Sequence, residues 1–317
     1  MTQPAETIVY YAMAIDPIHV GTGGYRLGRV DNSIVREPGT NLPKIPGSSL
    51  SGACRSYAAM VTGRYNWNEN GRYYSCAGQG QEDVRQNKAG HCARFDCPVC
   101  VAFGFARDHS GFQGLAQFAD ARLLFLPVHS LAGPVWVTCG AVLRDAGLPV
   151  KEEPAAGKVR IADGLKVAGN RLNLGWLMLP IEGKFQLEKA KLPIPDEIIR
   201  HSVLVPNQLF SIIVNNNLEV RTSVSIDPKT GAAEQGALFT YEAIPRSAIF
   251  WFSVTYLDPQ FFVINGQVPA PKINNHGTTV QTVVEKGLKQ FEYLGIGGMS
   301  TRGMGRLKVF LAEEGKK

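Results

Sequence analysis

Hydrophobic and polar positions along the chain predict short strands, broken by turns, together with two helices. Apolar runs of strand length occupy both ends and the middle of the sequence: residues 7–15, 117–128, 134–143, 248–257 and 307–311. Asp16 and Pro17 end the first run, and the runs 117–128 and 134–143 fit strands or strand-helix pieces of a core. Residues 144–200 follow no period that assigns them to an element.

Two segments have the apolar spacing of a helix. The apolar positions of residues 278–293 are Val280, Val283, Val284, Leu288 and Phe291, a helical spacing interrupted only by Gly287. Residues 50–60 predict a shorter helix, for which Ser48 or Ser49 is the expected N-cap. This second helix would therefore point its N-terminus at the long loop of residues 19–47.

Residues 219–252 predict a protruding hairpin. Two alternating segments flank the polar stretch 226–237, which carries turn chemistry at Asp227-Pro228 and at Thr230-Gly231. The order of strand, helix, strands, hairpin, helix, Gly-rich loop and strand predicts a ferredoxin-like α+β sheet with insertions. For a chain of 317 residues, one elaborated domain fits this order better than two.

Composition narrows the classes of protein that fit. With 44% hydrophobic and 19% charged residues the chain is not a disordered one, and no window approaches the about 18 consecutive apolar residues of a membrane span. The N-terminal segment lacks the basic residues that precede the apolar core of a signal peptide, so we expect a cytoplasmic, reducing location. The net charge of +6 suits a polyanionic partner but also occurs in many enzymes.

Four of the six cysteines gather in a polar insertion that lacks apolar periodicity. Cys97 and Cys100 form a CxxC pair, Cys92 follows His91, and Cys76 lies at the far end of the insertion. Soft ligands in a segment without a core match a structural zinc site, with Cys76 as the expected fourth ligand and His91 as the alternative. Buried thiols or a redox CxxC are the other interpretations.

The two remaining cysteines, Cys54 and Cys139, lie in apolar surroundings and are expected to be small core residues.

Two loops carry candidate chemistry. In the Gly-rich loop 295–306 we expect backbone N–H groups to face outward, beside the two arginines of the loop, as in proteins that hold phosphate without sequence preference; a tight turn is the alternative. Asp31 stands in a Gly-rich, basic loop near Arg29 and Arg36. Such a carboxylate is able to hold a divalent metal or to position a ribose 2′-hydroxyl, although most isolated loop aspartates do neither.

Six blocks of sequence carry a resemblance. They are residues 17–23 (PIHVGTG), 30–37 (VDNSIVRE), 43–55 (PKIPGSSLSGACR), 97–104 (CPVCVAFG), 221–245 and 297–305 (GGMSTRGMG). Together they resemble the repeat-associated mysterious protein (RAMP) superfamily, specifically the backbone subunits of type III CRISPR effector complexes of the Csm and Cmr kinds. The resemblance covers both ends and the middle of the chain, but not residues 144–200.

This resemblance implies one RRM-like domain over residues 1–317, with a zinc-bearing insertion at about 61–104 and a hairpin thumb at about 201–247. It implies a subunit that binds CRISPR RNA and target RNA, that assembles with copies of itself and with other effector subunits, and that binds no membrane. Asp31 matches the aspartate with which such subunits cut target RNA, using Mg²⁺ or Mn²⁺.

The resemblance also implies which residues contact RNA. They are Ser48, Ser49, Arg55, Gly297, Gly298, Thr301, Arg302, Gly303 and Arg306. Contacts to the RNA backbone suit a protein that must accept any guide, because base pairing reads the target. The chain has Ser51 where the family often has Lys, which removes one phosphate contact. For Phe239 in the thumb, packing on the palm is favoured over stacking on bases.

Two alternatives of function remain at this point. The first is a catalytically silent subunit that only binds guide RNA, against which Asp31 argues. The second is an endonuclease of the same superfamily that processes CRISPR RNA without metal through a His or Tyr base. His19 is the obvious candidate for that base, but a histidine at a strand end is more often structural.

Overall fold

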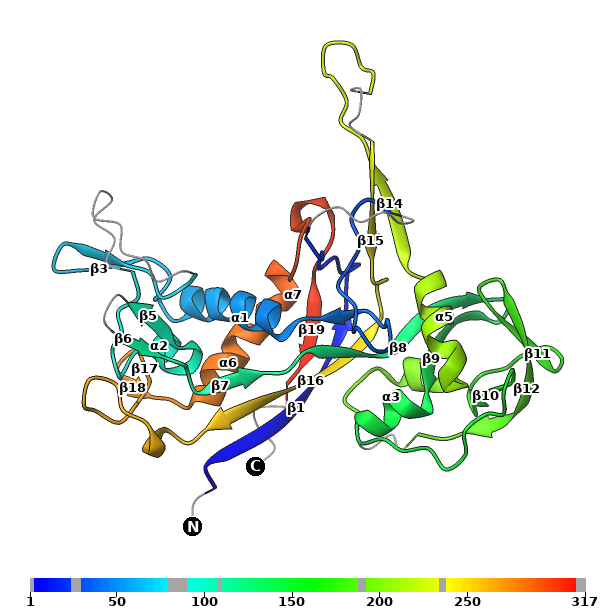
Figure 1. The fold of residues 1–317 in the computed structure, drawn as a ribbon, viewed down its shortest axis with the longest axis horizontal. Coiled ribbons are helices and arrows are strands. Elements are labelled where there is room, and N and C mark those ends of the chain that lie inside the picture. Colours follow the sequence, from blue (N-terminus) through cyan, green and yellow to red (C-terminus); the bar gives the residue numbers. More distant parts are fainter. Residues whose placement is uncertain are drawn as a thin grey trace.

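A large mixed sheet runs across the molecule, with helices on both of its faces (Figure 1). The computed structural model describes residues 3–23, 30–78, 90–107, 110–187, 192–233 and 238–311. The sheet has 11 strands, nine of them in the order β11-β12-β10-β13-β9-β8-β16-β1-β19, with β2 paired to β8 and β7 paired to β16. The strands are β1 (Ala5–Ala14), β2 (Lys44–Ile45), β7 (Ala116–Phe118), β8 (Ala121–Ser130), β9 (Gly133–Cys139), β10 (Val159–Ala162), β11 (Arg171–Leu174), β12 (Leu177–Phe185), β13 (Ser202–Val205), β16 (Ile249–Leu257) and β19 (Leu307–Phe310).

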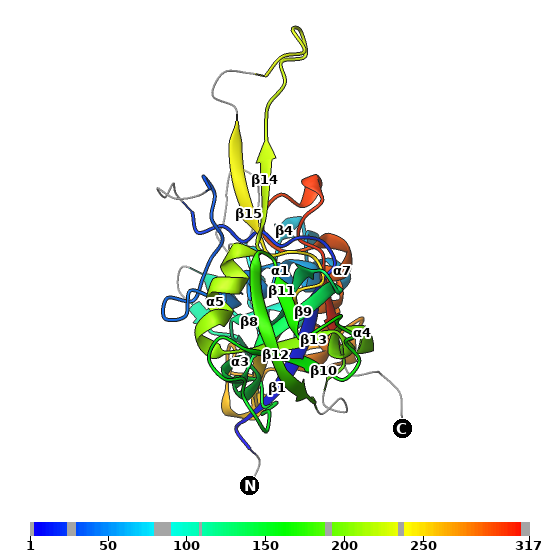
Figure 2. The same ribbon diagram turned by 90° about the vertical axis from the view of Figure 1, so that its right-hand side faces the viewer.

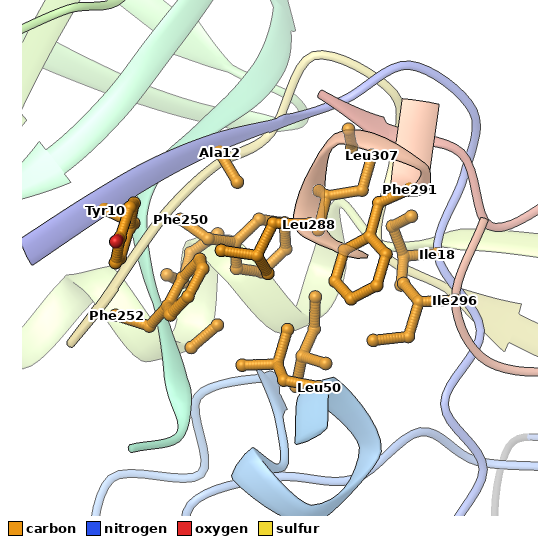
Figure 3. Close-up of a cluster of buried hydrophobic side chains, with 14 of the residues drawn as sticks. Tyr10, Ala12, Ile18, Leu50, Phe250, Phe252, Leu288, Phe291, Ile296 and Leu307 are labelled. Atoms are coloured by element: carbon orange, nitrogen blue, oxygen red, sulfur yellow. The ribbon is translucent and has the colours of Figure 1, made fainter. Parts of the chain in front are cut away.

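One half of the sheet, β8-β16-β1-β19, is antiparallel throughout. Helix α1 (Gly47–Val61) follows β1 and helix α6 (Val280–Lys289) follows β16, and the two helices pack on each other. Successive side chains of β16 point to opposite faces of the sheet. Phe250 and Phe252 therefore join the core beneath α1 and α6, while Ile249 joins the core on the opposite face. Figure 3 shows the first of these cores, in which side chains of β1 and β16 meet those of both helices.

Residues 144–200, which the sequence left unassigned, extend the other half of the sheet. They supply β10, β11 and β12, and β13 joins them to β9 through a parallel pairing. Helix α3 (Gly140–Asp145) and helix α4 (Asp196–Arg200) pack on one face, and α5 (Asn207–Asn216) lies on the other. β10 and β11 have only four residues each, which is too short for a period to be visible in the sequence.

The predicted hairpin is confirmed. Strands β14 (Glu219–Ser223) and β15 (Phe239–Ala243) pair antiparallel, and the hairpin projects from the body in both views of the molecule (Figures 1 and 2). Asp227 closes the compact turn in its distal part, where its side chain accepts hydrogen bonds from the amide of Lys229 and the hydroxyl of Thr230.

The segment between α1 and β7 lies at the end of the molecule opposite to α5 and β11 (Figure 1). It consists of short elements: β3 (Trp67–Glu69), β4 (Arg72–Tyr74), α2 (Pro98–Phe103), β5 (Phe105–Arg107) and β6 (Ser110–Phe112). β17 (Lys272–Ile273) and β18 (His276–Gly277) form a further hairpin next to it. Across the parts of the chain that the structure describes, no helix has both the length and the apolar character needed to span a membrane.

Both predicted helices are present, with different ends. The predicted helix 278–293 is divided into α6 and α7 (Phe291–Leu294), and the division falls at Gln290 rather than at Gly287. The expected N-cap of α1 is wrong, because the helix already begins at Gly47 and neither serine caps it. Instead the carboxylate of Asp120, from the turn before β8, accepts the N–H of Gly47 at 2.7 Å.

Candidate functional site

Asp31 lies at the root of the hairpin. Residues 30–36 run beside β15, where the amide of Asn32 donates to the carbonyl of Thr240 and the amide of Glu242 donates to the carbonyl of Asn32, both at 3.0 Å. The carboxylate Oδ2 of Asp31 accepts the amide of Thr240 at 2.7 Å and its hydroxyl at 2.8 Å. These bonds, the backbone one first, lower the pKa of the exposed Asp31 carboxyl below its usual range.

An ion pair fixes the same loop farther along. The guanidinium of Arg36 lies 2.7 Å from the buried carboxylate of Glu242, and its Nε donates to Asn215 of α5 at 2.9 Å. The other oxygen of Glu242 accepts the amide of Ile34 at 3.4 Å. The Glu242–Arg36 ion pair and its hydrogen bonds therefore connect the loop, the hairpin and α5. Arg29, the other predicted neighbour of Asp31, lies outside the described residues.

The C-terminal Gly-rich loop closely approaches the residues that follow β1. Gly297 has a φ of 84°, and a Cβ there would lie 2.4 Å from the carbonyl oxygen of His19, so only glycine fits. The amide of Gly298 donates to this carbonyl at 2.9 Å, and that of Gly305 donates to the carbonyl of Pro17 at 2.9 Å. The expectation that the loop's N–H groups face outward is therefore wrong for Gly298 and Gly305.

The same loop also packs on the hairpin root. Met304 is buried against Tyr241, and the guanidinium of Arg302 lies 5.9 Å from the ring centroid of Phe239 and 3.4 Å from the hydroxyl of Ser223. Phe239 thus packs on the body rather than standing free, as predicted. The predicted RNA contacts of this loop are exposed: Gly297, Gly298, Thr301, Arg302, Gly303 and Arg306.

Arg306 has a protein partner as well. Its guanidinium forms a two-pronged contact with the carboxylate of Asp16, at 2.5 and 2.9 Å. The hydrogen bond with Arg306 is the main reason that the pKa of the Asp16 carboxyl is lowered. The pair fixes the entry of β19 against the end of β1.

The residues of α1 that were predicted to contact RNA do not all face the same part of the molecule. Ser48 is exposed and Ser49 half-buried, both in the first turn of the helix. Arg55 lies farther along the helix and turns toward the cysteine-bearing segment, where its Nε donates to the carbonyl of Cys76 at 2.7 Å. Like Arg306, Arg55 is thus engaged within the protein.

The four predicted metal ligands come together. The sulfur atoms of Cys76, Cys92, Cys97 and Cys100 all lie within 4.8 Å of one another, and all four residues are buried. Three of the sulfur–sulfur separations are 3.5, 3.7 and 3.8 Å. A tetrahedral zinc with bonds of about 2.3 Å requires sulfur atoms about 3.8 Å apart, so the cluster fits this ion. Cys54 and Cys139 are buried elsewhere, as predicted.

His91 faces away from this cluster. Its Nε2 lies 3.0 Å from the carbonyl of Gly78, and its Nδ1 accepts the amide of Ala106 at 3.4 Å. Burial, followed by the proximity of Arg55, lowers the pKa of His91 below its usual range and favours the neutral ring. Of the two candidates for the fourth ligand, the geometry therefore selects Cys76.

His19 joins the Gly-rich loop to the hairpin strand β15. Its carbonyl accepts the amide of Gly298, its Nδ1 lies 2.6 Å from the carbonyl of Glu242, and its ring is buried against Tyr241. Those contacts give His19 a structural role, which the sequence analysis favoured over a catalytic one. A buried ring is poorly placed to act as the base of a metal-independent nuclease.

Asp31 and the Gly-rich loop thus meet at the root of the hairpin, whereas the cysteine cluster lies toward the opposite end of the molecule (Figure 1). Sequence reasoning missed Thr240 and Glu242, which hold the loop of Asp31 in place. They lie about 210 residues away along the chain, and their only signal was the position of both inside the block 221–245.

Comparison with known proteins gives consistent results. The sequence model of the RAMP superfamily matches residues 11–308. A CRISPR system Cmr endoribonuclease of Pyrococcus furiosus, Cmr4, is 28% identical over 320 residues, which cover 94% of this chain and 93% of the relative. A CRISPR endoribonuclease of Methanothermobacter thermautotrophicus, Csm3, is 32% identical over 99 residues, or 31% of this chain and 32% of the relative.

A solved structure also matches over nearly the whole chain. It belongs to a type III-B Cmr-beta complex determined by cryo-electron microscopy with cognate target RNA bound. The superposition covers 96% of each chain with a TM-score of 0.65 at 16% identity. At that identity the likeness shows the shared fold.

Proposed function

Because this chain belongs to the RAMP superfamily, we propose that it is a backbone subunit of a type III CRISPR effector complex and that it cuts guide-complementary target RNA at Asp31. The relatives named as Cmr4 and Csm3 endoribonucleases support the activity, and the structural match to a target-bound Cmr-beta complex supports the setting. The observation that carries the assignment is the exposed Asp31 carboxylate, fixed by Thr240 at the root of the projecting hairpin.

The architecture supports this role. The strand order β8-β16-β1-β19, with α1 and α6 packed together, supports our interpretation of this half as a ferredoxin-like palm and of the hairpin β14-β15 as its thumb. We interpret the whole chain as one such domain with insertions for the cysteine segment and the thumb. In the assembled complex it would line up with copies of itself and with other effector subunits along the CRISPR RNA, in the cytoplasm.

RNA binding is assigned to the surface at the foot of the thumb. The exposed Gly-rich loop and the first turn of α1 present Ser48, Ser49, Gly297, Gly298, Thr301, Arg302, Gly303 and Arg306. Small residues let the RNA backbone come close, and Arg302 supplies positive charge, whereas the charge of Arg306 is shared with Asp16. These contacts carry no sequence preference, which suits a protein whose target is chosen by base pairing.

Asp31 acts as a charged, fixed oxygen donor. Its lowered pKa keeps the carboxylate ionised at neutral pH and makes it a weak base, so a role in positioning fits better than proton abstraction. Thr240 occupies Oδ2, which leaves Oδ1 to face the RNA or a cation. A bound Mg²⁺ or Mn²⁺ would supply Lewis-acid polarisation of the phosphate. Asp31 would then hold the reacting 2′-hydroxyl or the cation at the position where the thumb separates the target RNA from the guide.

A structural zinc ion is proposed for the cysteine cluster. Cys76, Cys92, Cys97 and Cys100 would bind it, and the ion would join three separate stretches of this segment. Elemental analysis of the purified chain should find one zinc per protein, and Cys97→Ser should lose it and lower the thermal midpoint. Absence of zinc, together with normal folding of Cys97→Ser, would reject the site.

Cleavage is tested with the assembled complex. In Mg²⁺, the wild-type complex should cut a guide-complementary RNA at regular intervals, and the Asp31→Ala complex should assemble, bind the same RNA and leave it intact. A wild-type complex that binds target but never cuts would make the chain a silent guide-binding subunit. Unchanged cutting by Asp31→Ala would place the catalytic residue elsewhere.

A further inference from the structure

Arg55 reaches three separate parts of the cysteine-bearing segment from a single position on α1. Its Nε donates to the carbonyl of Cys76 at 2.7 Å, and its Nη1 donates to the carbonyl of Phe103, at the end of α2, at 3.3 Å. Its Nη2 lies 2.8 Å from Nε2 of His91, the residue before Cys92. The guanidinium therefore lies where the chain segments carrying Cys76, Cys92 and Cys100 converge.

The charges at this place are complementary. A zinc ion with four thiolates carries a net charge of 2 − 4 = −2, and this cluster is buried. A buried charge of that size needs a nearby cation or hydrogen-bond donors. Arg55 is a basic side chain held at this place by its hydrogen bonds to the carbonyls of Cys76 and Phe103.

The position of Arg55 on α1 connects the cluster to the rest of the protein. Cys54, the preceding residue, is buried on the side of α1 that packs against Gly287 of α6. Arg55 lies about 100° farther around the helix, on the side that faces the cysteine segment. Two adjacent residues of α1 thus make the packing contact to α6 and the contact to the cysteine segment.

We propose that Arg55 is a positioning residue of the metal site, which holds the cysteine segment on α1 and balances the charge of the metal–thiolate cluster. This inference rests on the zinc site proposed above. It differs from the RNA contact expected for Arg55 from the sequence, because the Nε and Nη1 donors of its guanidinium are directed to backbone carbonyls of the protein. Arg55 acts through the backbone of Cys76 and through the neighbour of Cys92, as outer groups around structural metals do.

The test measures zinc retention rather than activity. Purified full-length chains are mixed with a chromophoric chelator, and the rate of zinc transfer is followed for wild type, Arg55→Gln, Arg55→Lys and Arg72→Gln. Arg72 is an exposed arginine on β4 of the same segment, so its substitution makes the same change in net charge without touching the cluster. Affinity for guide RNA is measured on the same preparations.

We expect Arg55→Gln to release zinc about tenfold faster than wild type or more, the range found for outer groups around bound metals. The rate of zinc release from Arg55→Lys should lie between those of wild type and Arg55→Gln, because lysine keeps the charge but not the forked hydrogen bonds. Arg72→Gln should release zinc at the wild-type rate. If Arg55→Gln does not fold, faster release from Arg55→Lys supports the proposal and unchanged release overturns it.

Other outcomes separate the two proposals. A zinc-free wild type would reject the metal site itself. A zinc-loaded wild type whose release rate is unchanged in Arg55→Gln, together with weaker guide binding by that variant, would leave the metal site standing. In that case Arg55 would be an RNA ligand and the inference about Arg55 would be wrong.

Discussion

Asp31 and Thr240 are joined by three hydrogen bonds. The amide and the hydroxyl of Thr240 donate to the same carboxylate oxygen at 2.7 and 2.8 Å, and the amide of Asp31 donates to the threonine Oγ1 at 3.1 Å. Thr240 belongs to β15 of the hairpin, so the hairpin and the carboxylate share one rigid attachment. In the proposed function, the element that separates guide from target would also fix the position of the cutting group.

The hydroxyl of Thr240 can be tested apart from its backbone. Thr240→Val should slow target cleavage roughly three- to tenfold, the loss expected for one ordinary hydrogen bond at a solvent-exposed group, without changing guide affinity. The backbone hydrogen bond from Thr240 stays, but loss of the hydroxyl bond should raise the pKa of Asp31, so the acidic limb of the pH–rate profile should move to higher pH. Thr240→Ser, which keeps the hydroxyl, is the matched control. Equal rates and pH profiles for the Val variant and wild type would show that the hydroxyl plays no part.

Two glycines on packed helices should respond to alanine in opposite directions. A Cβ at Gly287 of α6 would lie 2.5 Å from the carbonyl oxygen of Cys54, so Gly287→Ala should lower the free energy of unfolding by about 1–3 kcal/mol. A Cβ at Gly52 of α1 would meet nothing within 4 Å, so Gly52→Ala should raise it by about 0.5–1 kcal/mol. Urea unfolding of the two variants measures both effects. A stabilising Gly287→Ala would contradict the close approach of α1 and α6.

Arg302 should contribute to guide binding chiefly through charge. Arg302→Ala is expected to weaken binding equally for guides of different sequence and to reduce the salt dependence of the binding constant by about one phosphate contact. Titrations of two unrelated guides at several salt concentrations measure both quantities. Lys286, an exposed cation in the last turn of α6, provides a charge-matched control in Lys286→Ala. Sequence-dependent losses in Arg302→Ala would argue against backbone recognition.

The Asp16–Arg306 pair should make stability depend on pH. The folded-state pKa of Asp16 is lowered, so the pair stabilises the protein above the unfolded-state value of about 3.9 and loses this effect as the pH falls through the folded-state pKa. Asp16→Asn should therefore have a lower thermal midpoint than wild type near neutral pH, and the difference should disappear in acid. A difference that persists unchanged at the lowest pH would show that charge is not its cause.

The sequence predicted the local elements well where the pattern was long. β1, β16, β19, α1 and α6 were predicted from apolar spacing and turn residues, and the cysteine cluster followed from ligand chemistry. Gly287 interrupts the apolar spacing of its helix, but in the structure it is the contact point with α1, a tertiary requirement that periodicity does not express. The start of α1 was placed too late for a similar reason, since Asp120 comes from a distant turn.

The parts of the site that could not be predicted depend on long-range contacts. The partnership of Asp31 with Thr240 joins residues 209 positions apart, and local sequence carries no information about it. Arg55 belongs to a block that resembles RNA-contacting segments, yet the packing of the cysteine segment against α1 sets its direction. The outward N–H groups expected of the Gly-rich loop were likewise taken up by the carbonyls of Pro17 and His19.

The most direct test of the account is single-turnover cleavage by the assembled complex carrying Asp31→Asn. This substitution keeps the size of the side chain and an oxygen that accepts from Thr240, but it removes the charge. With target binding measured on the same preparation, the account predicts unchanged affinity for target RNA and loss of every regularly spaced cut in Mg²⁺ and in Mn²⁺. Cleavage at the wild-type rate and positions by Asp31→Asn would contradict it.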